Sequence, residues 1–511
     1  MVVKVALLVV FFAIMIGIGM YARKRVQTVG DFVLGGRDVG PWLTAFAYGT
    51  SYFSGVVFIG YAGQFGWAYG VSATWIGIGN ALIGSLLAWV LLGRRTRIMT
   101  RHMKASTMPE FFRKRYDSKA IMVVASLIIF IFLVPYSASV YKGLSQLFAE
   151  AFHVNYIYCI WGMAILTAVY VVLGGYVATS INDFVQGLIM LVGIVAVIFA
   201  VLNGQGGFTE AIHKLSQIPA ESAPTLNGAY ASFFGPDPMG LLGVVLLTSL
   251  GTWGLPQMVH KFYAIRDERA IKTGTIISTI FALVVAGGSY FMGAFGRLYV
   301  DSPESVGGFD GIVPTMLGGQ LNDLLLGVVV LLVLSASMST LSSLVLTSSS
   351  TFTLDFVKDR FVKNMSDKGA MRMIRIMCVV FILLSVVLAL NPGNLITTLM
   401  SLSWGSLAGA FLAPFLYGLF WRRATRAGVW TSFVIGLGIT IGSLIFGWMA
   451  PPSAGAVAML VPLAVMPIVS LCTKAPDQKV VDDAFAGYDE VVTVREKFVL
   501  ISDEEEAAQK K

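Results

Sequence analysis

Charged residues are scarce in this sequence. Asp, Glu, Lys and Arg make up 13% of its 511 residues, against roughly 25% in a typical soluble domain. This scarcity, together with a mean hydropathy of +0.78, excludes an ordinary soluble globular chain. The apolar residues gather in blocks of about 20, the length that a helix needs to cross a bilayer. The sequence therefore predicts an all-α polytopic membrane protein.

Cysteine and histidine are also rare, and their spacing excludes several kinds of site. The three cysteines at 159, 378 and 472 are isolated and form no CxxC pair, so neither a disulfide framework nor a thiolate metal site is predicted. The four histidines form no HExxH pair, and no nucleophile elbow or phosphate-binding loop is present. We therefore predict that the protein is not an enzyme.

Basic residues are distributed unevenly, which orients the chain. With the N-terminus outside and the C-terminus in the cytoplasm, 32 of the 36 Lys and Arg residues fall in inside segments. Lys261 is one of these 32 inside residues. This bias is that of the positive-inside rule, and an even number of spans would break it. The net charge of +8 thus reflects topology in a cell membrane, and no nucleic-acid partner is predicted. We predict thirteen spans: 5–21, 41–68, 72–93, 120–152, 155–176, 181–203, 239–263, 271–297, 319–352, 372–391, 394–420, 427–450 and 455–473.

Two of these spans are poor helices. The second reads AFAYGTSYFSGVVFIGYAG (45–63) and the seventh LLTSLGTWGLPQMVHKF (246–262), and their glycines and proline predict interruptions, which lipid tolerates only beside a cavity or other helices. The two spans are five apart, so a five-span repeat would have its second copy inverted, which is typical of transporters. The predicted organisation is a peripheral span 1–22, repeats 41–203 and 239–420 around an external loop 204–238, two peripheral spans in 427–473, and a cytoplasmic tail 474–511.

A stripe of small and hydroxyl residues runs along the ninth span. At 100° per residue, its members fall within about 100° of arc. Such a stripe permits close helix packing or offers oxygens to a cation. Freed carbonyls in the broken second span, near 50–53, favour the cation, and hard oxygen ligands without a carboxylate cluster favour sodium. The members are Ala336, Ser339, Thr340, Ser343, Thr347 and Ser350.

Four stretches resemble a known family. LGGRDVGPWLTAF (34–46), GTWGLPQMVHKFYAIRD (251–267), ASMSTLSS (336–343) and FWRRATRAGVWTSFVIG (420–436) are similar to the sodium:solute symporters, close to their sodium/proline branch. The resemblance implies thirteen helices with a LeuT-like core of two inverted five-helix repeats. It also implies sodium-coupled symport, with sodium as the coupling ion. The implied sodium ligands are the carbonyls of Thr50, Phe53 and Ala336 and the hydroxyls of Ser339 and Thr340.

The same resemblance implies a second sodium in a subset of the family, and here its ligands would be Asp183, Ser342 and Ser343. Tyr136 of the fourth span matches the sodium/proline branch. Other positions depart from that branch: Tyr52 stands where an acid is usual, Thr248 and Thr252 replace an aromatic pair, and Leu255 replaces a glutamine.

Lys142 is the one basic residue that we place within a span. A cation there costs about 3 kcal/mol unless it is paired or hydrated. Three interpretations are open: Lys142 reaches the outer headgroups, forms a salt bridge to another helix, or holds an anionic group of the solute. In the last case Tyr52, Tyr136, Lys142, Gly251, Thr252, Trp253 and Pro256 would line the solute site.

The solute class follows from that last interpretation. It predicts a small carboxylate-bearing solute, either an amino acid such as proline or a short monocarboxylate or other organic acid. An ion channel and a nutrient sensor on a transporter body are the alternatives of other classes. The expected partners are the solute, sodium and the lipid bilayer, with no obligate protein partner.

Overall fold

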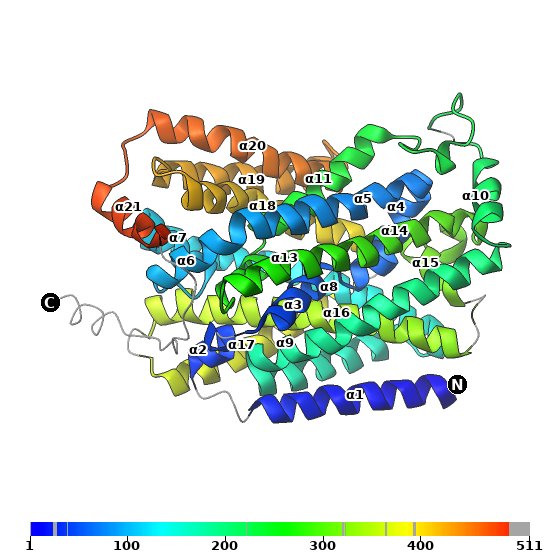
Figure 1. Ribbon diagram of the computed structural model, residues 1–511, viewed down its shortest axis with the longest axis horizontal. Coiled ribbons are helices and arrows are strands. Elements are labelled where there is room, and N and C mark those ends of the chain that lie inside the picture. The colour runs from blue at the N-terminus through cyan, green and yellow to red at the C-terminus, as the bar shows by residue number, and fades with distance from the viewer. Residues whose placement is uncertain are drawn as a thin grey trace.

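The computed structural model describes residues 2–23, 28–37, 39–220, 222–318, 321, 323–362, 365–391 and 395–489. Its helices run side by side along the long axis (Figure 1). The N-terminus, α10 (Phe208–Ser216) and α15 (Phe309–Gly318) lie at one end, and α6 (Arg94–His102), α7 (Met108–Tyr116) and α21 (Gln478–Phe485) lie at the other. The acidic end of the predicted tail lies outside the described residues.

The predicted membrane architecture is present, but the predicted number of thirteen spans is not confirmed by helix length and composition among the described residues. Ten helices of the described chain are long and apolar enough to cross a membrane, and the bent pair α11 (Pro238–Gly254) and α12 (Pro256–Tyr263) makes an eleventh candidate. The second predicted span contributes a short helix, α3 (Pro41–Tyr52), and residues 57–69 after its break. A φ of +61° at Gly70 then interrupts the helix before the third predicted span begins. The fifth and sixth both lie in α9 (Tyr156–Gly204), as two helices that meet at a break at Gly175, whose φ of +56° suits glycine.

The other bounds complete the element order. The α-helices are α1 Val2–Arg23, α2 Val29–Leu34, α3 Pro41–Tyr52, α4 Ala62–Tyr69, α5 Thr74–Gly79, α8 Lys119–Phe152, α9 Tyr156–Gly204, α11 Pro238–Gly254, α12 Pro256–Tyr263, α13 Glu268–Ala282, α14 Gly288–Gly293, α16 Asp323–Thr351, α17 Asp367–Ala389, α18 Ile396–Phe420, α19 Arg426–Phe446 and α20 Pro451–Cys472. Short π-helical or 3-10 segments continue several of them: Val57–Tyr61, Gly70–Ala73, Asn80–Leu87, Trp89–Gly93, Leu283–Gly287, Ala294–Leu298 and Phe352–Lys358.

Both predicted interruptions are present. After α3 the chain is extended at Phe53 (φ −109°, ψ 101°). A second extended residue, Leu255, separates α11 from α12, which bend by 46°. Pro256 follows directly, and proline restricts the preceding residue to extended conformations.

The hydroxyl-rich helix α16 is the centre of the molecule. It packs against α1, α3, α8, α9, α12 and α17, and its side chains from Ser335 to Thr351 are all buried. The break of the second span lies directly on it, because a Cβ at Gly55 would come within 2.3 Å of the Ser337 hydroxyl. Glycine at this position therefore allows the broken backbone to approach α16. In Figure 1, α1 lies along one edge of the bundle and α20 along the opposite edge.

Candidate functional site

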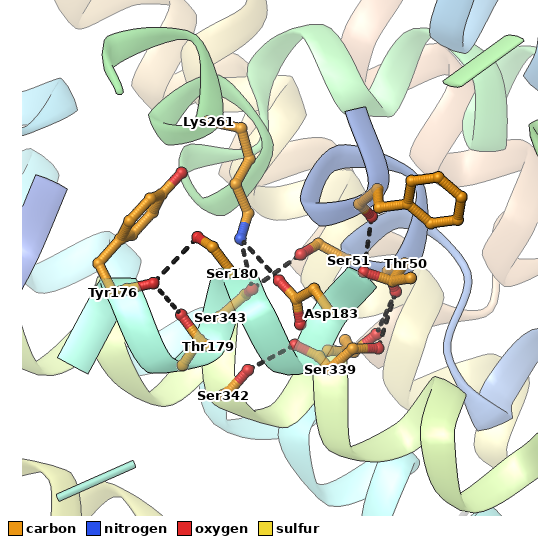
Figure 2. A network of polar contacts seen from close by, with 12 residues as sticks. Thr50, Ser51, Tyr176, Thr179, Ser180, Asp183, Lys261, Ser339, Ser342 and Ser343 are labelled. Carbon is orange, nitrogen blue, oxygen red and sulfur yellow. Dashed lines mark hydrogen bonds and ion pairs between the residues drawn. The ribbon is translucent and has the colours of Figure 1, made fainter. Parts of the chain in front are cut away.

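The oxygens predicted to bind sodium meet between α3 and α16. The hydroxyl of Ser339 lies 3.1 Å from the Thr50 carbonyl and 3.1 Å from the Ala336 carbonyl. Thr340 adds a second hydroxyl 3.4 Å from the same Thr50 oxygen. All four residues are completely buried, and Figure 2 shows Ser339 directed toward Thr50. The structure therefore brings four of the five predicted ligands together, and the fifth, Phe53, is the extended residue that follows α3.

The end of α3 explains why the carbonyls of Thr50 and Phe53 are available to bind a cation. The last carbonyls of a helix lack partners along the chain and form the negative end of its dipole. In an unbroken helix the Val57 N–H would bond to the Phe53 carbonyl, but it donates instead to Ser54, at 3.0 Å. Neutral carbonyl and hydroxyl oxygens are ligands for a hard cation.

The second predicted set contains an unexpected member, Lys261. Its ammonium lies 3.0 Å from the Ser343 hydroxyl and 3.6 Å from the nearer Asp183 oxygen. The Ser343 hydroxyl is also 2.8 Å from that of Ser51. Ser342 points back toward the first set and donates to the Ser339 carbonyl at 2.8 Å. Asp183, Ser343 and a lysine thus share one place (Figure 2).

The expectation that Lys142 is the only basic residue within a span is wrong. The sequence places Lys261 in the inside segment 261–272, but α12 is buried along its whole length and the Lys261 side chain is 3% exposed. A lysine so close to the predicted end of a broken span was the available signal. The packing of Lys261 against α9 and α16 could not be predicted from the sequence, because these helices are far from α12 in the chain.

Aromatic side chains cover the break of the second span. The ring of Trp404, on α18, lies 6.1 Å from that of Tyr52 and 6.0 Å from that of Tyr136. Among the described residues, the Tyr136 hydroxyl and the Trp404 indole N–H have no hydrogen-bond partner although both are buried. Buried polar groups are rarely left unpaired, so these two groups are candidates for contact with a solute. Trp404 was not predicted.

The predicted solute residues of the seventh span face in different directions. A Cβ at Gly251 would lie 2.6 Å from the Trp404 ring, so Gly251 belongs with the aromatic group. The Thr252 hydroxyl and the Trp253 indole N–H donate to the carbonyls of Gly84 and Ile83, each at 3.0 Å. These two side chains therefore contact the third span, whereas Pro256 begins α12 at the break.

Lys142 lies in a salt bridge, which was one of the three alternatives. Its ammonium is 3.9 Å from Asp310 of α15, and the two side chains are 6% and 4% exposed. The same Asp310 oxygen accepts the backbone N–H of Ile396 at 3.1 Å. Lys142 is therefore directed toward α15 and the start of α18.

Comparison with known proteins identifies relatives over most of the chain. A model of the sodium:solute symporter family matches residues 32–436. The sodium/proline symporter of Salmonella typhimurium (strain LT2) is 30% identical over 85% of this chain and 86% of its own length. The osmoregulated proline transporter OpuE of Bacillus subtilis (strain 168) is 29% identical over 84% of this chain and 86% of its own length.

Solved structures share the fold. The substrate-bound, outward-open structure of a Na⁺-coupled sialic acid symporter matches with a TM-score of 0.72 and 17% identity, covering 93% of this chain and 99% of its own. Mhp1, a nucleobase-cation-symport-1 family transporter in a closed conformation, matches with a TM-score of 0.53 and 14% identity, covering 89% of this chain and 97% of its own.

Proposed function

Because the chain belongs to the sodium:solute symporter family, we propose that it takes up a small carboxylate-bearing solute, such as a proline-like amino acid, together with sodium. Its membership makes it a sodium-coupled secondary transporter rather than an enzyme. The observation that carries the proposal is the convergence of the Ser339 and Thr340 hydroxyls on the freed Thr50 carbonyl.

The proposed architecture is a LeuT-like core of two inverted five-helix repeats, 41–203 and 239–420, within thirteen spans. The N-terminus lies outside and the C-terminus in the cytoplasm. The breaks at Phe53 and Leu255 support this arrangement because they fall at matching places of the two repeats. Interrupted helices at matching places surround the central site of such transporters.

Sodium is proposed to bind between α3 and α16 through five oxygens. These are the carbonyls of Thr50, Phe53 and Ala336 and the hydroxyls of Ser339 and Thr340. In the alternating-access cycle, sodium that bridges the two helices stabilises the outward-open state, and joint occupancy by sodium and solute favours the inward-open state. Each ligand shifts the equilibrium only by its differential affinity for the two states.

The solute is proposed to bind beside the break of the second span, where Tyr52, Tyr136 and Trp404 meet. The Tyr136 hydroxyl and the Trp404 indole N–H supply hydrogen-bond donors. The N-terminus of the half-helix that follows the break favours a carboxylate through its positive dipole end, although Ser54 already accepts the N–H groups of Val56 and Val57. The flat aromatic faces suit a compact ring such as that of proline.

A short monocarboxylate is the second candidate. Thr248 and Leu255 replace bulkier or amide side chains of the sodium/proline branch, which changes the wall of the site. Lys142 is proposed to hold the anionic group in either case. It would have to exchange Asp310 for the solute, because the two side chains are only 3.9 Å apart.

Uptake by proteoliposomes tests the proposal. The purified protein is offered a panel of labelled amino acids and short carboxylates, with an inward sodium gradient or with choline in its place. We expect accumulation of a carboxylate-bearing compound that depends on sodium and is inhibited by unlabelled proline. Equal uptake without sodium, or a sugar as the best substrate, would contradict the proposal.

A further inference from the structure

The ammonium group of Lys261 lies among oxygens suited to a cation. It comes from α12, the half of the broken seventh span that follows Pro256, and it reaches across to α9 and α16 (Figure 2). Its contacts are the Ser343 hydroxyl at 3.0 Å, an Asp183 oxygen at 3.6 Å and the face of the Tyr176 ring at 5.2 Å.

These contacts satisfy the ammonium group. A lysine ammonium has three N–H donors and no acceptor. A hydroxyl, a carboxylate and an aromatic face are three groups that attract it, the last through the electron density of the ring. The Lys261 ammonium group is therefore bound among these three groups and does not extend past them to solvent.

The negative charge of the Asp183 carboxylate is balanced by the positive charge of Lys261. The Asp183 side chain is 0% exposed, and neither of its oxygens has a hydrogen bond within 3.5 Å among the described residues. Lys261 is the cation that faces this carboxylate. A sodium ion beside both would leave a net positive charge in a buried region, where an uncompensated charge is strongly disfavoured.

We propose that Lys261 is a tethered cation that takes the place of a second sodium. The ligands that would serve such an ion, Asp183 and Ser343, are held by the lysine, so the protein binds one sodium per solute. This inference rests on the proposed function, and it assigns the number of coupling ions to a side chain of the transporter itself.

The position of Lys261 also connects it to the first sodium site. Ser343 is hydrogen-bonded to Ser51, and Ser51 follows Thr50, whose carbonyl belongs to the first site. Movement of α12 relative to α9 and α16 would separate the Lys261–Asp183 pair.

The test counts bound ²²Na⁺ on the purified full-length protein in lipid nanodiscs. We expect one sodium per wild-type protein and a Hill coefficient near one. Lys261→Met vacates the place and leaves Asp183 free, so the count rises to two and the Hill coefficient rises above one. Adding Asp183→Asn to that variant should return the number of bound sodium ions to one. Lys261→Arg keeps the positive charge and should also bind one sodium ion.

Lys4→Met is the matched control, since it removes another buried lysine that pairs with an aspartate, Asp323, at 3.2 Å. Its count stays at one. Two sodium ions on the wild-type protein overturn the inference, as does a Lys261→Met variant that still binds only one. If Lys261→Met does not fold, the wild-type count decides, with one supporting the inference and two overturning it. A wild-type protein that binds no sodium refutes the proposed function itself.

Discussion

Two proposed cation places lie next to each other on α16, and they differ in the charge of the groups that form them. The first is built from the Thr50 and Ala336 carbonyls and the Ser339 and Thr340 hydroxyls, all neutral oxygens. The second, at Ser343, faces a buried carboxylate and a buried ammonium. Four residues, about one helical turn, separate Ser339 from Ser343. The same row of hydroxyls can thus serve an exchangeable ion at one turn and a permanent one at the next.

The largest expected effect comes from breaking the charged place. Asp183→Asn leaves the Lys261 ammonium buried without its carboxylate, and loss of one partner of a buried pair costs about 3–5 kcal/mol. We expect a marked fall in thermal stability in detergent. The variant Asp183→Asn with Lys261→Met removes both charges and should recover most of that loss. If Asp183→Asn alone were as stable as wild type, the ion pair would not hold α12 to α9.

A second buried pair, Lys142 and Asp310, sharpens the comparison. Asp310 keeps the Ile396 N–H when the lysine is removed, but its buried carboxylate loses its cation. Lys142→Met should therefore also lose thermal stability, and its uptake is compared per mole of folded protein. If Lys142 holds the anionic group of the solute, transport should fall by about tenfold or more, equivalent to at least about 1.4 kcal/mol. The half-saturating sodium concentration should not change. Normal solute transport by this variant would mean that Lys142 only forms the salt bridge to Asp310 and does not bind the solute.

Tyr136→Phe should affect the solute and not the sodium. Loss of one neutral hydrogen bond costs about 1 kcal/mol, so we expect the half-saturating solute concentration to rise about fivefold. The control is Tyr141→Phe, which makes the same change five residues later on α8, where the hydroxyl is also buried and unpaired among the described residues. Equal effects of the two variants on uptake would remove Tyr136 from the solute site.

The smallest expected effect is at the hydroxyl pair that links the two cation places. Ser51→Ala removes its 2.8 Å hydrogen bond to Ser343 but no proposed ligand of either cation. A neutral hydrogen bond of about 0.5–1 kcal/mol predicts a two- to fivefold rise in the sodium concentration for half-maximal uptake. No change would mean that the two places act independently.

The first cation place could be predicted from local sequence. Glycine at 49 and 55 around Phe53 marked the broken helix, and the spacing of Ala336, Ser339 and Thr340 marked a single face. Both signals depend on residues close together in the chain. The structure then needed only to bring one broken helix against one hydroxyl face, and close packing at Gly55 allows that approach.

The second place could not be predicted in the same way. Lys261 lies two residues before the end of α12, where a basic residue is ordinarily interpreted as facing the cytoplasm. Its burial depends on three helices that are far apart in sequence. Trp404 was missed for a similar reason, because the stretch SLSWGSLAG gives no sign of which helix its ring meets. The count of thirteen spans rests on charge alternation, and whether two consecutive spans are separate helices depends on single glycine breaks such as those at Gly70 and Gly175.

The sodium dependence of solute uptake in Ser339→Ala tests the central claim most directly. Initial uptake rates are measured in proteoliposomes over a range of sodium concentrations, for wild type, Ser339→Ala and the control Ser350→Ala. The control residue is buried on the same helix and bonds to the Thr347 carbonyl. We predict that Ser339→Ala raises the half-saturating sodium concentration by about tenfold or more, as expected for loss of a ligand worth at least about 1.4 kcal/mol, while Ser350→Ala leaves it within about twofold. An unchanged sodium dependence in Ser339→Ala would contradict the assignment of sodium to the contact between α3 and α16.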